Sequence, residues 1–589
     1  MIDKQHAVDQ KFKQRIYLWW RRFGGQCSWG IVAVAGVLTL VLGIMGFDHA
    51  DGNAIPFSTR VYLALQLFTM ESGSVTDRAE VGWKLETARW TAVMAAFGTL
   101  INTLIAIFSK QIHSFYLSRL SGHIVVVGSG DGGAQLAGDL IKAGRSVVVV
   151  EKETNAEHLL QLSQMGVAEC FGDASDPAVL QSVAVKNAEL IAVLAGDDSV
   201  NLSIANSIRL ACDGAVRSQP VKAFIDVSDS RLFSVACPES RCVDFARFSR
   251  RDNSARALFK EHPLDEDGIS MLDTRRVHLV IFGHNQMAES LVTQALATMH
   301  FANQLPGMLT VIADGADRKK QRLMCQAPEF DSCAEINFCE GDASDPEPRR
   351  RLRDALDDPN QLVTVVICDS NFKRVLAECL DLAPLMNQRN CKIFLESSKS
   401  DERGFHVNFK QFPNLKVELF GQTETACSAE YVIGEELDTL ARQIHEKYVA
   451  KRLAEGDTPE QFPAMCPWQQ LSSELKIMNR QQADHISTKL RALNMEMASH
   501  PTPQPKWPRE PTNEEIEALA KAEHDRWAAC KRLAGWKSGK ERNDTLQIHP
   551  DLVPWSELSE TIRDYDRDPI RNLPKLLSGI GYTLVSRVE

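Results

Sequence analysis

The sequence predicts a membrane hairpin of α-helices, followed by two doubly wound α/β domains and a small, mainly α-helical C-terminal domain. Three observations predict this order: two long uncharged apolar segments near the N-terminus, a series of strands and helices that occurs twice, and a helical, tryptophan-rich end. A chain of 589 residues is also too long for one hydrophobic core, so several domains are expected.

The composition argues against two classes of site. A net charge of −11 disfavours a nucleic-acid binder, because contact with phosphates needs a basic face. The 14 cysteines are scattered without any CxxC pair, and Cys237 and Cys242 are the closest two. We interpret them as reduced core thiols of a cytosolic protein rather than as metal ligands, and expect no metal site.

Two segments have the length and composition of membrane spans. Residues 30–47 and 90–108 carry no charged side chain, and each has about the length that crosses the ~30 Å core of a bilayer. No small-residue cleavage site follows the first segment, so we expect no signal peptide. Basic residues precede the first span and follow the second, so the positive-inside rule predicts a multi-pass inner (plasma) membrane protein with cytoplasmic termini. Residues 1–29 form a basic helix in the inner interface in this interpretation.

A third apolar run, residues 61–70, lies between the two spans of segment 30–108. It is too short to cross the membrane and is followed by the polar turn ESGS, so we expect a re-entrant helix and a pore loop over residues 59–74. Such an order is typical of two-helix cation channels, in which carbonyls and acidic side chains select the ion. The expected pore residues are Thr69, Glu71, Ser72 and Gly73. The filter sequence TVGYG is absent, so the selectivity stays open, and an extracytoplasmic amphipathic loop is the alternative.

A glycine-rich turn follows the first strand predicted after the spans. The strand ends at Gly128, and GSGDGG then leads into a helix, which gives GxGxxG between strand and helix. Gly128 permits the tight turn, Gly130 lets a phosphate approach the backbone, and Gly133 lets the helix pack closely on the strand. A pyrophosphate would lie at the helix N-terminus. We therefore predict a Rossmann-type nucleotide-binding domain over residues 121–260.

The next strand indicates the kind of nucleotide. It ends in Glu151, where a carboxylate can accept a hydrogen bond from a ribose hydroxyl, and this favours NAD-like over 2′-phosphorylated ligands. We predict NAD(H) or a related adenine nucleotide as a regulatory ligand; the alternative is a Rossmann fold that has lost its ligand. The candidate binding residues are Gly128, Ser129, Gly130, Asp131, Gly132, Gly133, Glu151, Lys152, Gly172, Asp173 and Ala174.

The same order of elements recurs over residues 275–425. The pentapeptide GDASD follows the third strand of both copies, at 172–176 and 341–345, which indicates a tandem repeat. In the second copy Asn285 and Ala288 replace two of the glycines. Because a Cβ at position 285 would crowd a pyrophosphate, we expect this copy to be structural, with His284 as a turn residue.

These motifs resemble a known family. The two spans, GxGxxG, Glu151, both GDASD motifs and GDDSVN at 196–201 are similar to the TrkA-N/RCK regulatory domains of potassium transport. Together with residues 66–74, they also resemble the ligand-gated cation channels of the CASTOR/POLLUX type. The resemblance covers about residues 25–425 and implies a cytoplasmic gating ring in a homotetramer.

The remaining chain predicts a helical connector over residues 430–500, a proline-rich linker at 501–511 and a terminal domain at 512–589. The terminal segments EHDRW, GW and HPDLVPW are closely similar to the bacterial form of the RyR domain, which implies a sensor of a nucleotide-like ligand. Aromatic faces beside cationic side chains suit a base or a ribose phosphate; a small aromatic core is the alternative. The candidate residues are Arg526, Trp527, Trp536, His549 and Trp555.

Together these features favour a nucleotide-regulated membrane cation channel, with lipid, cations and a small nucleotide as partners and no catalytic residues. The RyR resemblance adds a role as an effector in bacterial stress or phage defence. The alternative is a membrane-anchored sensor or scaffold that does not conduct. An NAD-dependent oxidoreductase is disfavoured, because a second Rossmann copy stands where a substrate domain is expected.

Overall fold

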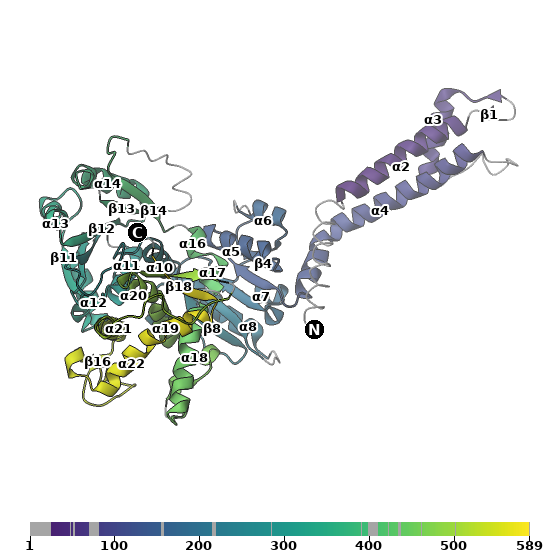
Figure 1. Ribbon diagram of the computed structural model, residues 1–589. Coiled ribbons are helices and arrows are strands. Elements are labelled where there is room, and N and C mark those ends of the chain that lie inside the picture. The colour runs from purple at the N-terminus through teal and green to yellow at the C-terminus, as the bar shows by residue number, and fades with distance from the viewer. Residues whose placement is uncertain are drawn as a thin grey trace.

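A helical arm projects from a globular body (Figure 1). The computed structural model describes residues 25–47, 49–50, 53–69, 82–154, 158–214, 219–283, 285–389, 391–397, 410–421, 423–433, 438–460, 462–500 and 502–587.

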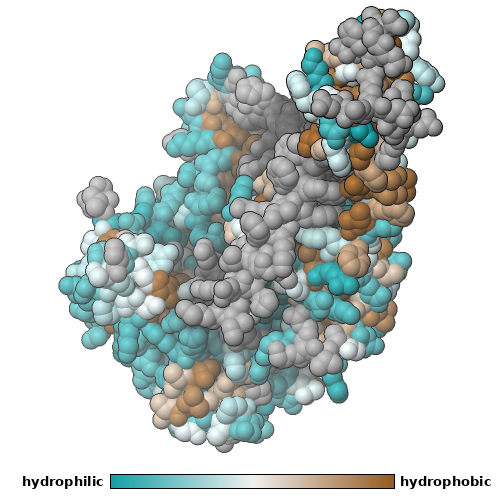
Figure 2. Space-filling model, turned by 90° about the vertical axis from the view of Figure 1, so that its right-hand side faces the viewer, coloured by the Kyte–Doolittle hydropathy of each residue, from teal (hydrophilic) through white to brown (hydrophobic). Residues whose placement is uncertain are grey.

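Two antiparallel helices build the arm: α2 (Gly25–Gly46) and α4 (Trp83–Ser118). Both are long and apolar enough to cross a membrane. Figure 2, which views the molecule from the side of the arm, shows hydrophobic side chains on the arm and a mostly hydrophilic body. Glycine lets the helices approach closely, since a Cβ on Gly98 would lie 2.6 Å from Val32 Cγ2. Thr39 and Thr91 add a hydrogen bond of 2.9 Å between the helices.

A short helix packs beside the outer ends of these two helices (Figure 1). It is α3 (Phe57–Gln66), continued by the 3-10 turn η2 (Leu67–Thr69) and preceded by the two-residue strands β1 (His49–Ala50) and β2 (Asn53–Ala54). Leu67 is buried with Phe47 of the α2 side and Leu85 of α4. The apolar run between the spans therefore forms a short helix that is packed into the arm.

The first Rossmann lobe is a six-stranded parallel sheet with strand order β5-β4-β3-β6-β7-β8. Its central strands are runs of β-branched residues buried on both faces, as expected for a parallel sheet covered by helices. The elements in chain order are β3 (Ile124–Val127), α5 (Asp131–Lys142), β4 (Val147–Glu151), α6 (Leu159–Met165), β5 (Ala168–Phe171), α7 (Pro177–Ser182), η4 (Val185–Asn187), β6 (Leu190–Val193), α8 (Asp198–Cys212), β7 (Val221–Asp226), α9 (Ser230–Ala236), β8 (Val243–Phe248) and α10 (Arg250–Glu261).

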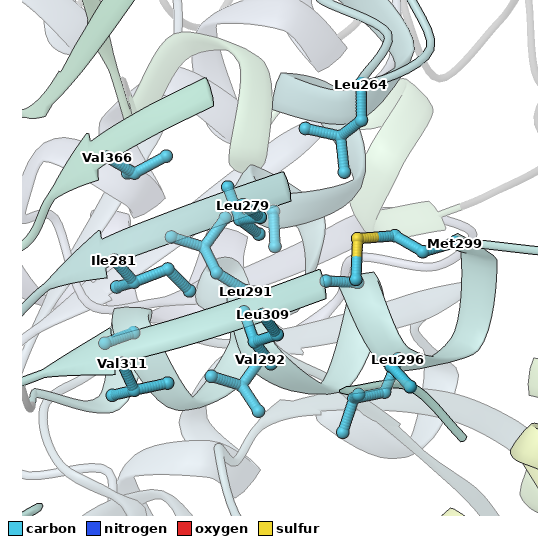
Figure 3. Close-up of a cluster of buried hydrophobic side chains, with 14 of the residues drawn as sticks. Leu264, Leu279, Ile281, Leu291, Val292, Leu296, Met299, Leu309, Val311 and Val366 are labelled. Atoms are coloured by element: carbon cyan, nitrogen blue, oxygen red, sulfur yellow. The ribbon is translucent and has the colours of Figure 1, made fainter. Parts of the chain in front are cut away.

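The second Rossmann lobe repeats this topology with the strand order β11-β10-β9-β12-β13-β14. The equal order of the two sheets confirms the tandem repeat predicted from GDASD. Figure 3 shows the core between its strands and α11, with Leu279, Ile281 and Leu291 in contact. The elements are β9 (Arg276–Phe282), α11 (Gln286–Thr298), β10 (Met308–Ile312), α12 (Ala316–Gln326), η5 (Phe330–Ser332), β11 (Glu335–Cys339), α13 (Pro346–Asp357), β12 (Gln361–Ile367), α14 (Phe372–Asn387), β13 (Lys392–Glu396) and β14 (Lys416–Phe420).

Each lobe lends a helical segment to the core of the other. Helix α10 ends the first lobe, but its Ala255 and Leu258 are buried in the core of the second. After β14 the chain forms α16 (Thr423–Ala426) and α17 (Ala429–Ile433). Cys427, between the two helices, and Val432 of α17 are buried in the core of the first lobe. Asn253 of α10 links the two exchanged segments, because its side-chain amide donates a hydrogen bond to Ala426 O at 3.0 Å. The two lobes therefore share their cores reciprocally.

The C-terminal part is a mainly helical unit closed by one pair of strands. Strand β15 precedes the proline-rich segment, and it pairs antiparallel with β18 at the end of the chain, Met495 opposite Ser586. The predicted linker at 501–511 therefore lies inside one packed unit. The elements are α18 (Asp438–Ala454), η6 (Pro463–Met465), η7 (Trp468–Gln470), α19 (Ser473–Asp484), α20 (Ile486–Ala492), β15 (Met495–Ser499), α21 (Asn513–Leu533), β16 (Lys537–Ser538), β17 (Ile548–His549), η8 (Trp555–Glu557), α22 (Glu560–Arg571), α23 (Leu573–Ser578) and β18 (Tyr582–Ser586).

Candidate nucleotide site

The glycine-rich turn has the conformation that its sequence demands. Gly128 has φ +95°, and a Cβ there would lie 2.7 Å from Leu194 O. A Cβ on Gly133 would overlap Gly128 O, so α5 can begin this close to β3 only with glycine at this position. Gly130 differs, because a Cβ there would meet nothing within 4 Å. Packing inside the protein therefore explains Gly128 and Gly133, whereas at Gly130 it leaves space open for a ligand.

The N-termini of the two corresponding helices differ. Gly130 precedes α5 and supplies no side-chain cap to its first turn. At α11, Asn285 accepts a hydrogen bond from Ala288 N at 3.0 Å and donates one to Glu396 Oε2 at 2.7 Å. Unpaired N–H groups at a helix N-terminus attract anions. The first lobe leaves its N-terminus to a ligand, and the second fills it with its own side chain.

Glu151 lies at the end of β4, beside the turn. One carboxylate oxygen accepts from Ser129 N and Ser129 Oγ at 2.6 and 2.7 Å, and the other accepts from Lys152 N at 2.7 Å and Glu153 N at 3.1 Å. Burial acts to raise the pKa of Glu151, but the hydrogen bonds from Ser129, Glu153 and Lys152 hold it below its usual value. An ionised carboxylate at this place suits ribose hydroxyls and would repel a 2′-phosphate.

The fold brings the predicted residues of the first lobe together at one edge of the sheet. The three segments follow β3, β4 and β5, which are neighbouring parallel strands. Lys152 Nζ lies 2.9 Å from Asp173 Oδ2 and so joins two of the segments, and Asp131 pairs with His158 Nε2 at 2.8 Å. Such an edge next to the strand-order reversal is where open α/β sheets bind ligands. The residues present therefore fit a dinucleotide without a 2′-phosphate.

Asn201 is a positioning residue that the sequence interpretation did not single out. It is fully buried, its Oδ1 accepts from Ala195 N at 2.9 Å, and its Nδ2 donates to Asp226 O at 2.9 Å. It thus fixes the turn after β6, whose Leu194 O lies against Gly128. The signal was present, because Asn201 is the last residue of the GDDSVN motif.

Four of the candidate residues of the C-terminal unit lie in one row of rings. Trp536 and Trp527 both contact His549, with ring centroids 6.0 and 5.0 Å apart, and His524 then links Trp527 to Trp555. Trp536 is buried with Leu552 in a small core. Most of the rings meet edge to face, an arrangement common between packed aromatic side chains, which supports the alternative that they form a small aromatic core.

Family models match two parts of the chain. Residues 124–219 match the TrkA-N domain, and residues 509–586 match the RyR domain. The chain contains a TrkA-N domain and a RyR domain. The TrkA-N match lies within the first Rossmann lobe, and the RyR match begins in the proline-rich segment and ends with β18.

Several solved structures are similar to the chain. The GsuK channel bound to NAD is 13% identical, with 71% of this chain and 82% of that chain covered and a TM-score of 0.35. GsuK bound to ADP is 15% identical, with 67% and 93% covered and a TM-score of 0.34. The NAD(P)-binding domain of an exopolyphosphatase-related protein from Archaeoglobus fulgidus is 24% identical, with 21% and 87% covered and a TM-score of 0.18.

Arg526 of the RyR domain does not lie where a ligand residue is expected. Its side chain is 2% exposed, and its guanidinium donates to both carboxylate oxygens of Glu523 and to Cys530 Sγ. Lys489 Nζ of α20 reaches the same carboxylate at 2.5 Å. The guanidinium donors of Arg526 thus face partners inside the protein, and its assignment as a ligand-binding residue stays a prediction.

Of the predicted pore residues, Thr69 lies at the end of η2. Its hydroxyl donates to Gln66 O at 2.8 Å. Glu71, Ser72 and Gly73 lie outside the described residues, as does His284 of the second lobe.

Proposed function

We propose that the protein is a nucleotide-regulated cation channel of the bacterial inner membrane, a homotetramer whose TrkA-N domain binds NAD(H) and whose RyR domain senses a second nucleotide-like ligand. In this proposal α2 and α4 span the membrane, α3 is the re-entrant helix of the pore, and both termini are cytoplasmic. An effector role in stress or phage defence belongs to the same proposal.

The observation that carries the proposal is the continuity of α4. It runs for 36 residues from the apolar arm to Ser118 and so extends beyond the apolar segment 90–108. Leu117 at its end is buried in the core of the TrkA-N domain, and His113 Nε2 lies 2.7 Å from Glu169 O of β5. A movement of this sheet edge is therefore transmitted to α4 without a flexible joint.

The nucleotide would act from the carboxyl ends of the neighbouring strands. Ser129 and Glu151, which are hydrogen-bonded to each other, follow β3 and β4, and β4 pairs with β5, on which His113 is docked. A ligand that competes for the Glu151 carboxylate changes this network. A ligand shifts a closed–open equilibrium only by its differential affinity for the two states, about 1–3 kcal/mol per site in typical cases, and four equivalent sites add up.

The nucleotide part is tested by the contrast between the two lobes. We expect NAD to bind the purified full-length protein, and Gly130→Val to abolish binding while leaving the melting temperature unchanged, because Gly130 faces open space. Asn285→Val in the second lobe is the matched control and keeps NAD binding. Isothermal titration of both variants checks this; binding lost in Asn285→Val and kept in Gly130→Val would contradict the assignment.

A non-conducting membrane-anchored sensor is the second candidate. The dense packing of α3 against the arm favours it, because Gly43 contacts Ala64 so closely that a Cβ would lie 2.9 Å from Ala64 Cβ. A short helix fixed in this way also serves as an interfacial anchor. Recording of ion currents separates the two candidates.

A further inference from the structure

A groove of about 540 Å³ lies where the RyR domain meets the second Rossmann lobe. The lobe contributes Met271 and Leu272 from the segment before β9 and Ala302 and Gln304 from the turn after α11. The RyR domain contributes one face of α21. Grooves of this size at domain junctions are typical sites for small molecules, which usually fill about 300–1,000 Å³.

The face of α21 in the groove carries a particular arrangement of charge. Glu514, Glu517, Ala518 and Lys521 follow the spacing of one helix face. Glu517 is already engaged, because its carboxylate accepts from Trp555 Nε1 at 3.0 Å and Arg567 Nε at 2.7 Å. Lys521 interacts electrostatically with Glu517 and Asp525 of its own helix, and Glu514 is hydrogen-bonded to Thr512. Seven residues apart, Glu514 and Lys521 place a carboxylate and an ammonium group about 10 Å from each other along the groove.

Between these two charges lies the carboxylate of Glu517, which Trp555 and Arg567 hold, and beside it the groove has an apolar wall. Ala518 and Ala302 lie between its walls, and Met271 and Leu272 form one side. Leu272 exposes 82% of its surface at this place. An apolar wall beside an acceptor and a cation is complementary to a flat ring that carries an amino group at one end and an anionic group at the other.

The protein holds the groove in shape. Gln304 has φ +61°, a left-handed conformation that costs free energy in a residue other than glycine. Its side-chain amide donates to Ala518 O of α21 at 2.9 Å and to Ala302 O at 3.2 Å. The turn of the second lobe is thus fastened to the helix of the RyR domain across the groove. Strain of this kind is retained where surrounding contacts fix a binding site.

We propose that this groove binds a nucleotide with an amino-bearing base, such as an adenosine monophosphate unit. Its phosphate pairs with Lys521, its exocyclic amine donates to Glu514, and its base lies over Met271 and Leu272. The inference rests on the proposed function, in which the RyR domain senses a nucleotide-like ligand, and it moves the site from the row of rings to the domain junction. A ligand bound there touches both the RyR domain and the second lobe and so couples them.

The test uses full-length protein in detergent, with Gly130→Val present throughout to remove the TrkA-N site, and AMP as the probe in equilibrium dialysis. We expect one AMP per chain, with Lys521→Glu and Leu272→Asp each weakening binding about tenfold or more through loss of a charged contact or of the apolar wall. Lys537→Glu is the matched control, an exposed lysine of the RyR domain outside the groove, and keeps full affinity. Melting curves of each variant check folding.

Three results would overturn the assignment. If no AMP binds, or if both groove variants bind it as Lys537→Glu does, the groove is not the site; in the second case AMP binds elsewhere on the protein. If Lys537→Glu weakens AMP binding as well, the loss in the groove variants reflects the net charge of the protein and not a contact in the groove. NAD binding by the protein with Gly130 intact is measured in parallel, so a failure of the groove is distinguished from a failure of the TrkA-N site.

Discussion

At the scale of single residues, the three glycines of the GxGxxG motif differ in why a side chain is absent at each position. Gly128 and Gly133 are required by the packing of β3, β6 and α5, and would be needed in a Rossmann lobe that binds nothing. Gly130 has no such internal reason. The motif in the sequence therefore predicted the fold of the turn, and Gly130 is the glycine at which the proposed nucleotide binding can be tested without disturbing the packing.

The buried charges of the RyR domain allow a prediction about stability. Glu523 compensates both Arg526 and Lys489, and all three side chains are at most 3% exposed. Glu523→Ala leaves two cations without a partner in the core, so we expect a loss of about 3–5 kcal/mol in the free energy of unfolding. Chemical denaturation measures it. Glu560→Ala, an exposed carboxylate of α22, is the control with a loss below about 1 kcal/mol; similar values for both variants would contradict the structural role of Glu523.

At Arg526 the sequence alone does not decide between two roles. An arginine beside a tryptophan on a helix suits either a ligand or a core ion pair, and the decision depends on Lys489, which lies 37 residues earlier in the chain. Because Glu523 is three residues from Arg526, the sequence indicates an i,i+3 ion pair. It does not indicate that this pair is buried. Ser129 and Glu151, in contrast, lie within one short strand–turn–helix–strand unit, and they are hydrogen-bonded to each other.

At the scale of elements, the order of strands and helices was predictable and the exchange of helices between lobes was not. Runs of buried β-branched residues and repeated motifs have a local signal. The contact of Asn253 with Ala426 joins positions 173 residues apart, and the pairing of β15 with β18 encloses the proline-rich segment. Both depend on tertiary packing, which leaves no periodic pattern in the sequence.

The exchanged helices predict a coupling that mutations can measure. A Cβ on Gly132 of α5 would lie 2.9 Å from Cys427 Sγ, so Gly132→Ala forces α5 away from α16 and α17. We expect a loss of about 1–3 kcal/mol in stability and weaker NAD binding. In the double variant, Cys427→Ala removes the obstructing sulfur and is expected to restore part of the stability and part of the NAD affinity.

A matched control lies on the same helix. At Gly138 of α5 a Cβ would meet only Met165 Cε, at an ordinary 3.8 Å. Gly138→Ala is therefore expected to leave stability equal or to raise it by up to about 1 kcal/mol, since alanine favours helix. Thermal melts of the single and double variants decide; an equal effect of both alanines, or no rescue by Cys427→Ala, would rule out the contact as the cause.

At the scale of the whole molecule, the lobes and the RyR domain form one connected body, and acid should loosen one of its joints. Burial lowers the pKa of His300 to about 4 and that of His485 well below the usual 6.5, and His485 Nε2 donates to His300 O at 2.8 Å across the joint. Lys489, Glu523, Arg526 and His300 act electrostatically on His485.

The sign of the effect follows from proton uptake. Between pH 6.5 and about 4 the unfolded chain binds protons at these histidines and the folded chain does not, so stability falls as the pH falls through this range. Denaturation at pH 7 and pH 5 measures it, and His300→Gln should reduce the difference. A stability that rises on acidification, or a His300→Gln variant with an unchanged slope, would contradict the assignment.

The same connected body links the nucleotide edge of the TrkA-N domain to α4 and so to the arm. The central claim is that this link controls ion conduction. Recording of ion currents through the purified protein in planar bilayers tests it most directly. We expect cation currents whose open probability changes on addition of NAD to the cytoplasmic side, and a Gly130→Val protein that conducts but no longer responds. Silence of the wild-type protein, or an NAD response that persists in Gly130→Val, would contradict it.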